Sequence, residues 1–134
     1  MPADDFILFV DDDNTCLGPL AAGVFNQTCT NPQYEARSAG VATTGKPIDK
    51  MILDTLMEID APTAELEPAK LTPQLADKAF MIISLGPQDF ASDPVLKGRE
   101  VTHWRFERPK PDIASTRQVR DRIKMRVNSF VSKL

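Results

Sequence analysis

The sequence is short of the features that mark several classes of protein. It has one histidine and two cysteines, Cys16 and Cys29, among 134 residues, so it holds no disulfide framework. No apolar run approaches the roughly 20 residues that span a bilayer. The first five residues carry no basic segment, so we expect neither a secretory signal nor a membrane partner. These absences lead us to expect a cytoplasmic protein.

Positive charge is not in excess either. Lys and Arg total 16 and Asp and Glu total 19, which gives a formal net charge of −3. A nucleic-acid-binding domain needs clustered cations to contact phosphates, so the charge balance argues against a nucleic-acid partner. The chain is 42% hydrophobic and 26% charged, a globular composition, and we expect one domain over residues 1–134.

Apolar runs and helical patterns alternate along the chain. The uninterrupted run at residues 6–10 predicts a parallel strand buried on both faces. After a polar loop, Pro19 predicts the first position of a helix, where its missing N–H would be unpaired anyway. We expect further strands at residues 34–39, 80–85 and 101–106, and further helices opening at Pro47, at Pro73 after an N-cap Thr72, and beyond Pro111. This order predicts a small open α/β sheet, in which ligands bind at the carboxyl ends of the strands, here residues 11–18.

The pattern Asp11-x-Asp13-x-Thr15 after an apolar run resembles the first motif of haloacid-dehalogenase-type phosphatases. That resemblance implies an Mg²⁺-dependent phosphatase with Asp11 as the nucleophile and Asp13 as the general acid. It covers about ten residues, and no later Lys or acidic metal motif accompanies it. The interpretation stays open as an alternative function.

The same acidic run also resembles the opening of response-regulator receiver domains. By position, Asp54 would then be the phospho-acceptor, Ser84 the hydroxyl residue and Lys110 the cation. Asp54 falls within a helical pattern, however, and Pro47 leaves no space for the helix and strand that a receiver needs before the acceptor. A receiver-like phospho-acceptor is therefore a second alternative.

A third resemblance covers nearly the whole chain. The sequence resembles the low-molecular-weight protein tyrosine phosphatase superfamily, closest to its thioredoxin-coupled arsenate reductases. The residues that carry it are Asn14-Thr15-Cys16-x-x-Pro19-Leu20-Ala21, Ser38-Ala39-Gly40, Leu71-Thr72-Pro73, His103-Trp104-x-Phe106 and Val119-Arg120-Asp121-x-Ile123. The resemblance implies a flavodoxin-like three-layer α/β sandwich, with a four-stranded parallel sheet in the order 2-1-3-4 and helices on both faces.

The chain departs from that superfamily where its chemistry lies. The superfamily separates a Cys nucleophile from an oxyanion-clamping Arg by five residues, and its general acid is an Asp before a Pro. The matching positions here are Asp11, Leu17 and Arg108, and the two redox cysteines of the reductases match Gly86 and Asp93. We therefore expect a catalytically degenerate protein without catalytic residues. It would act as a binding or regulatory module for a protein partner, and an oxyanion substrate is not expected.

We expect the contact surface at the degenerate anion loop and its rim, namely Asp11, Asp12, Asp13, Asn14, Thr15, Cys16, Leu17, Gly18 and Arg108. One hypothesis is that the Asp11 carboxylate occupies the anion site and accepts the loop N–H bonds, because those donors need a partner if buried. A second is that Asp11, Asp12 and Asp13 hold Mg²⁺ or Ca²⁺. Otherwise no cofactor is expected.

Three further expectations concern single side chains near this loop. Cys16 matches a secondary loop cysteine of the superfamily, and we expect a buried filler of the core. His103 has no partner at metal-ligand spacing, so we expect it to pack beside Trp104. Arg105, Arg108 and Lys110 either pair with the acidic loop or stay in solvent, and the sequence leaves this open.

Overall fold

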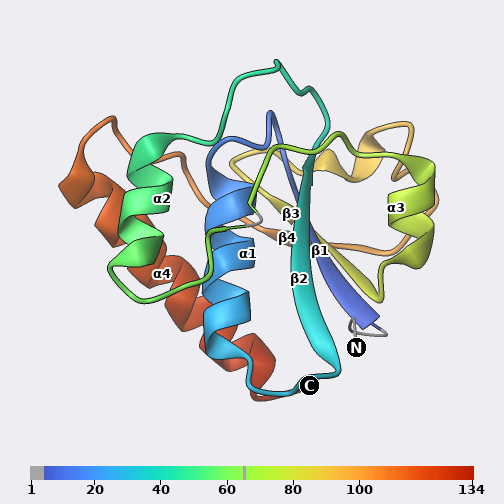
Figure 1. Cartoon of the computed structure of the whole chain (residues 1–134). Coiled ribbons are helices and arrows are strands. Elements are labelled where there is room, and N and C mark those ends of the chain that lie inside the picture. The colour runs from blue at the N-terminus through green and yellow to red at the C-terminus, as the bar shows by residue number, and fades with distance from the viewer. Residues whose placement is uncertain (1–4, 65) are drawn as a thin grey trace.

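The computed structural model describes residues 5–64 and 66–134, and its centre is a parallel sheet in the order β2-β1-β3-β4 (Figure 1). The predicted strand order and fold class are confirmed. Residues 1–4, which carry part of the argument against a secretory signal, lie outside the described residues. The strands are β1 (Asp5–Asp11), β2 (Tyr34–Gly40), β3 (Met81–Leu85) and β4 (Val101–Trp104).

Helices cover both faces of the sheet, as predicted (Figure 1). Three of them pack against one another on one face, while α3 and the short 3₁₀ helix η1 lie on the other. Within the described residues, no helix combines the length and apolar character needed to cross a membrane. The elements are α1 (Leu17–Thr28), α2 (Lys50–Met57), α3 (Pro73–Lys78), η1 (Phe90–Ser92) and α4 (Ile113–Val131).

The apolar run in β1 is buried on both faces because its side chains alternate between two cores. Ile7 and Phe9 pack under α1 and α4, in the larger core. Phe6, Leu8 and Val10 pack in the smaller core under α3. None of these five side chains is more than 4% exposed. The central strand therefore holds its carboxyl end, and the loop that follows, in a fixed position.

Two of the proline-based helix starts are wrong. α1 begins at Leu17, so Pro19 is its third residue and not its first. The fold tolerates this because the first four N–H groups of a helix have no partner within it, and the Leu20 amide makes the first bond, to the Cys16 carbonyl. α2 begins at Lys50, three residues after Pro47, and the Asp49 amide just before it donates to the Thr15 carbonyl, which ties this end of α2 to the first loop.

The other boundaries agree more closely with the sequence. Thr72 caps α3 by accepting a hydrogen bond from the Leu75 amide, and Pro73 is the first residue of that helix, as predicted. β4 ends at Trp104, two residues before its predicted end. Trp104 pairs with Leu85, the last residue of β3, so the chain beyond it has no strand to join.

Candidate functional site

The first loop connects the carboxyl end of β1 to the amino end of α1, at the edge of the sheet where the sequence predicts the site. Asp11 is the last residue of β1, and its side chain is only 3% exposed. Its Oδ2 accepts a hydrogen bond of 2.7 Å from the Gly18 amide, one of the N–H groups at the start of α1. Its Oδ1 accepts a 3.3 Å bond from the Asn14 side chain.

Burial dominates the electrostatics of Asp11. Desolvation raises the pKa of its carboxyl from 3.8 to about 6, although the donors of Gly18 and Asn14 act in the opposite direction. The charge of nearby Asp13 also disfavours ionisation. Asp11 is therefore a buried carboxylate that holds a helix amide and is repelled by a neighbour of its own sign.

Asn14 holds the loop in its sharp turn. Its φ of 62° lies in the left-handed region, which asparagine tolerates better than most residues. Its side chain is fully buried and accepts a 2.9 Å bond from the Ala69 amide while it donates to Asp11. The turn also presses against β2, because a Cβ at Gly40 would lie 2.8 Å from the Asn14 nitrogen.

Asp13 and Arg108 join the loop to the segment after β4. Asp13 Oδ1 accepts bonds from the Thr15 amide (3.1 Å), the Thr15 hydroxyl (2.8 Å) and the Arg108 guanidinium (3.3 Å). Partial burial raises the pKa of the Asp13 carboxyl, but these bonds and the Arg108 charge outweigh it and lower the pKa overall. Arg108 also lies 3.8 Å from Asp49. Of the three cations considered above, Arg108 pairs with the acidic loop, whereas Arg105 lies 4.0 Å from Glu107.

Cys16 and Leu17 bring apolar character to the start of α1. Each side chain is 3% exposed, so Cys16 is the buried filler that we expected. Burial raises the pKa of the Cys16 thiol to about 12, and the lowering effect of the Arg108 charge does not offset it. A thiol with such a pKa is protonated at neutral pH, and only the thiolate is a good nucleophile.

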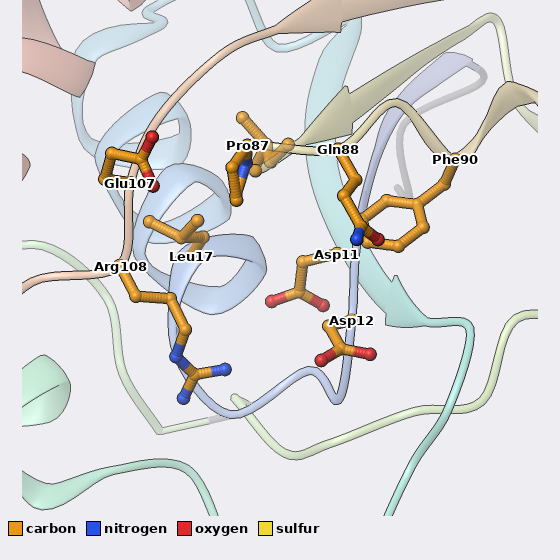
Figure 2. Close-up of a pocket in the computed structure, with 10 residues that line it drawn as sticks. Asp11, Asp12, Leu17, Pro87, Gln88, Phe90, Glu107 and Arg108 are labelled. Carbon is orange, nitrogen blue, oxygen red and sulfur yellow. The ribbon is translucent and has the colours of Figure 1, made fainter.

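A cavity of about 340 Å³ opens over the loop. Figure 2 shows the Asp11 and Asp12 carboxylates near each other, with Leu17 and Pro87 on one side and Gln88 and Phe90 on the other. Asp12 is exposed, in contrast to Asp11. The cavity is lined by Asp11, Asp12, Leu17, Leu85, Gly86, Pro87, Gln88, Phe90, Glu107 and Arg108.

Comparisons with known proteins identify the fold that carries this site. No protein-family model matches the chain, and no curated protein matches its sequence. Among solved structures, a low-molecular-weight protein tyrosine phosphatase from T. tengcongensis superposes with a TM-score of 0.86 at 19% identity, over 97% of this chain and 99% of that one. The chain has the fold of these phosphatases.

Two further structures extend the likeness within that fold. An arsenate reductase from Archaeoglobus fulgidus has a TM-score of 0.78 and 25% identity, over 94% of this chain and 98% of that one. The YwlE arginine phosphatase from Geobacillus stearothermophilus has a TM-score of 0.80 and 22% identity, over 96% and 92%. Both kinds of protein named by the sequence resemblance, phosphatase and arsenate reductase, therefore share this phosphatase-like architecture.

The three consecutive carboxylates of the loop do not converge on one point. Asp11 faces Gly18 and Asn14, Asp13 faces Thr15 and Arg108, and Asp12 is exposed. Across residues 5–64 and 66–134, no group of three His, Cys, Asp or Glu side chains is arranged to hold a metal ion. The Mg²⁺ or Ca²⁺ hypothesis therefore has no preformed ligand set in this part of the chain.

The remaining sequence candidates lie apart from the loop or have structural partners. His103 Nε2 lies 2.9 Å from the Gly86 carbonyl oxygen, next to the cavity wall. Asp54 lies in α2 and pairs with Lys50 at 3.0 Å, as expected from the helical pattern. Asp93 accepts a bond from the Val95 amide, and the Ser84 hydroxyl accepts one from the Phe90 amide.

Sequence reasoning missed one wall of the site. Gln88 and Phe90 line the cavity, and Asp49 approaches Arg108 from the start of α2. The sequence places Gly86-Pro87 directly after the expected strand at residues 80–85, and that place at the carboxyl end of β3 is the signal that could have marked the segment. Nothing in the sequence pattern indicates Asp49, because its position depends on how the chain before α2 returns to the loop.

Proposed function

We propose that this protein is a non-catalytic binding or regulatory module of the cytoplasm, built on a phosphatase and arsenate-reductase scaffold. The observation that carries the proposal is the Asp11 carboxylate, which accepts the Gly18 amide at the start of α1. Such amides, together with the helix dipole, make the start of a helix an anion site. Here a side chain of the protein supplies the anion.

The superfamily resemblance indicates what the contact between Asp11 and the Gly18 amide replaces. It matches Asp11 to the nucleophilic cysteine, Leu17 to the oxyanion-clamping arginine and Arg108 to the general acid. Leu17 has no donor for an oxyanion, and Arg108 is paired with Asp13 and has no acidic proton to give. Cys16, with its raised pKa, does not replace the missing nucleophile.

Electrostatics opposes an oxyanion in the loop. A phosphate at the Gly18 amide would meet the Asp11 carboxylate, which already holds that amide. At about 4 Å and an effective dielectric near 20, this repulsion costs about 4 kcal/mol. The amides of the helix start do not offset it, because a helix end contributes at most about 2 kcal/mol to a nearby charge.

Two observations weigh against the alternative functions. An aspartyl phosphatase of this kind needs both carboxylates of its motif to face one Mg²⁺ ion, whereas Asp11 faces Gly18 and Asn14 and Asp13 faces Thr15 and Arg108. A receiver-like acceptor needs Asp54 at the end of a strand, whereas Asp54 lies within α2.

The proposal is tested by hydrolysis of p-nitrophenyl phosphate by the purified protein, with Mg²⁺ and with a chelator. An Asp11→Asn variant serves as the matched control, because it removes the charge and keeps the shape. We expect no turnover above that of buffer in any of the four combinations. Turnover that requires both Mg²⁺ and Asp11 would instead establish an aspartyl phosphatase.

A further inference from the structure

The cavity over the loop combines apolar walls with negative charge. The apolar residues of its lining are Leu17, Leu85, Pro87 and Phe90, of which Leu17 and Leu85 are almost fully buried. Its volume, about 340 Å³, lies within the roughly 300–1,000 Å³ of ordinary ligand pockets. A side chain with an apolar stem and a polar end therefore fits it better than a small inorganic ion.

The charge of the lining is negative. Asp11, Asp12 and Glu107 contribute three carboxylates against the single guanidinium of Arg108. That guanidinium is engaged by Asp13 and lies 3.8 Å from Asp49. In Figure 2 it points to the base of the loop, while the Asp11 and Asp12 carboxylates lie together on the cavity side. The charged neighbour that acts on Asp11 is Asp13, which repels it. The lining therefore lacks a cation opposite its buried carboxylate.

We propose that the cavity receives the guanidinium group of an arginine side chain from a partner protein, between the carboxylates of Asp11 and Asp12. The methylene stem of that arginine would lie against Leu17 and Pro87, with the Phe90 ring beside the planar group. The inference rests on the proposed binding function and names the chemistry of its partner. It reverses the charge preference expected of an oxyanion loop on this scaffold.

Arginine fits this lining better than lysine for two reasons. A planar guanidinium donates in several directions at once, so it can bond two neighbouring carboxylates, whereas an ammonium acts as a point charge. It is also less strongly hydrated and stacks on aromatic rings, and Phe90 offers such a ring at the wall. The ammonium group of a lysine is not planar and could not stack on the Phe90 ring in this way.

The test is a titration of the whole protein at pH 7.5, followed through its backbone amide resonances. The probe is N-acetyl-arginine methylamide, and N-acetyl-citrulline methylamide is the matched control because its urea group has the same shape without the charge. We expect saturable shifts of Gly18, Gly86, Gln88 and Phe90 with the arginine probe, weakened by added salt. We expect no saturable shift with citrulline.

Two variants locate the binding charge. Asp12→Asn removes an exposed carboxylate of the lining, so we expect a correctly folded protein that binds the arginine probe about three- to fivefold more weakly. Asp54→Asn removes the same charge from α2, outside the lining, and should bind like the wild type. Equal weakening by both variants would show a general charge effect and overturn the assignment to the cavity.

The outcomes separate this inference from the proposed function. Equal binding of arginine and citrulline probes, or tighter binding of N-acetyl-lysine methylamide, would overturn the guanidinium assignment. No shift with any probe would also overturn it, while the absence of p-nitrophenyl phosphate turnover would leave the non-catalytic function standing. Turnover of that ester would overturn both.

Discussion

At the scale of the residue, the most informative side chain is Asp11, because it is a carboxylate whose burial disfavours the ionised form. Asp11 is buried, holds the Gly18 amide and has a pKa of about 6. Its ionisation at neutral pH therefore costs free energy of folding. This cost makes Asp11 measurable apart from any partner.

The raised pKa predicts a specific dependence of stability on pH. Between about pH 4 and pH 6 the folded protein keeps the Asp11 proton and the unfolded chain has lost it, so the unfolded state binds fewer protons. The Asp11 contribution to the unfolding free energy therefore falls as pH rises, in total by on the order of 3 kcal/mol. Asp13, Asn14, Cys16 and Gly18 are the groups that face Asp11.

Urea unfolding between pH 4 and pH 8 checks this dependence. The Asp11→Asn variant cannot lose a proton at this position, so we expect its unfolding free energy to lack the decrease with rising pH that Asp11 causes. The difference in unfolding free energy between wild type and variant should therefore change with pH up to about pH 6. Asp12→Asn removes an exposed carboxylate and should keep the wild-type slope. A difference between Asp11→Asn and wild type that does not vary with pH would contradict the raised pKa.

The buried thiol of Cys16 predicts selective labelling. Its pKa of about 12 and its 3% exposure leave almost no accessible thiolate, so a thiol reagent at pH 8 should modify Cys29, which is only partly buried, and spare Cys16. Mass spectrometry of the native Cys29→Ser protein should show no adduct until the chain is unfolded. Rapid labelling of that native variant would mean that Cys16 is activated.

At the scale of the element, the order of strands and helices could be predicted from the apolar runs and prolines. An uninterrupted apolar run indicates a strand that is buried on both faces, and the side chains of β1 are indeed divided between the two cores. The starts of α1 and α2 could not be predicted from the prolines, because each is tied to the first loop by a contact that the local pattern does not show, Gly18 to Asp11 for α1 and Asp49 to Thr15 for α2. The Asp49 amide bonds the Thr15 carbonyl across the loop, and no local pattern encodes that contact.

The candidate site was predictable in part for the same reason. The segment 11–18 follows directly from the rule that ligands bind at the carboxyl ends of parallel strands. Its partners from elsewhere, Ala69 on Asn14 and Arg108 on Asp13, come from connections whose paths the sequence does not specify. Whether the cations after β4 pair with the acidic loop depends on the path of the segment between β4 and α4, which brings Arg108 to Asp13.

The exposed edge of the sheet predicts a structural role for Asn26. Its side chain, on α1, accepts from the Ala36 amide at 2.7 Å and donates to the Ala36 carbonyl at 3.1 Å, which satisfies both backbone groups of this residue in edge strand β2. Asn26→Ala leaves both groups without this partner, and we expect a loss of about 1–2 kcal/mol in unfolding free energy. Gln27→Ala, one residue on, should change the free energy by less than about 0.5 kcal/mol. Equal losses of unfolding free energy in the two variants would show that the two hydrogen bonds between Asn26 and Ala36 do not stabilise the fold.

At the scale of the whole molecule, the scaffold and its site give different kinds of evidence. The sheet order, the helices on both faces and the match to phosphatase structures concern the fold. The function depends on a few positions, because one fold hosts many chemistries. In this chain those positions carry carboxylates, a leucine and a paired arginine, and we propose that they bind a cation rather than an oxyanion.

The central claim is that the Asp11 carboxylate occupies the anion site at the start of α1. It is tested most directly by following the Gly18 amide resonance while inorganic phosphate is added to the wild-type protein at constant ionic strength. We predict that this resonance does not move, because its N–H is already held by Asp11 at 2.7 Å. A saturable shift of the Gly18 amide would show that phosphate displaces the carboxylate, and the account would be wrong.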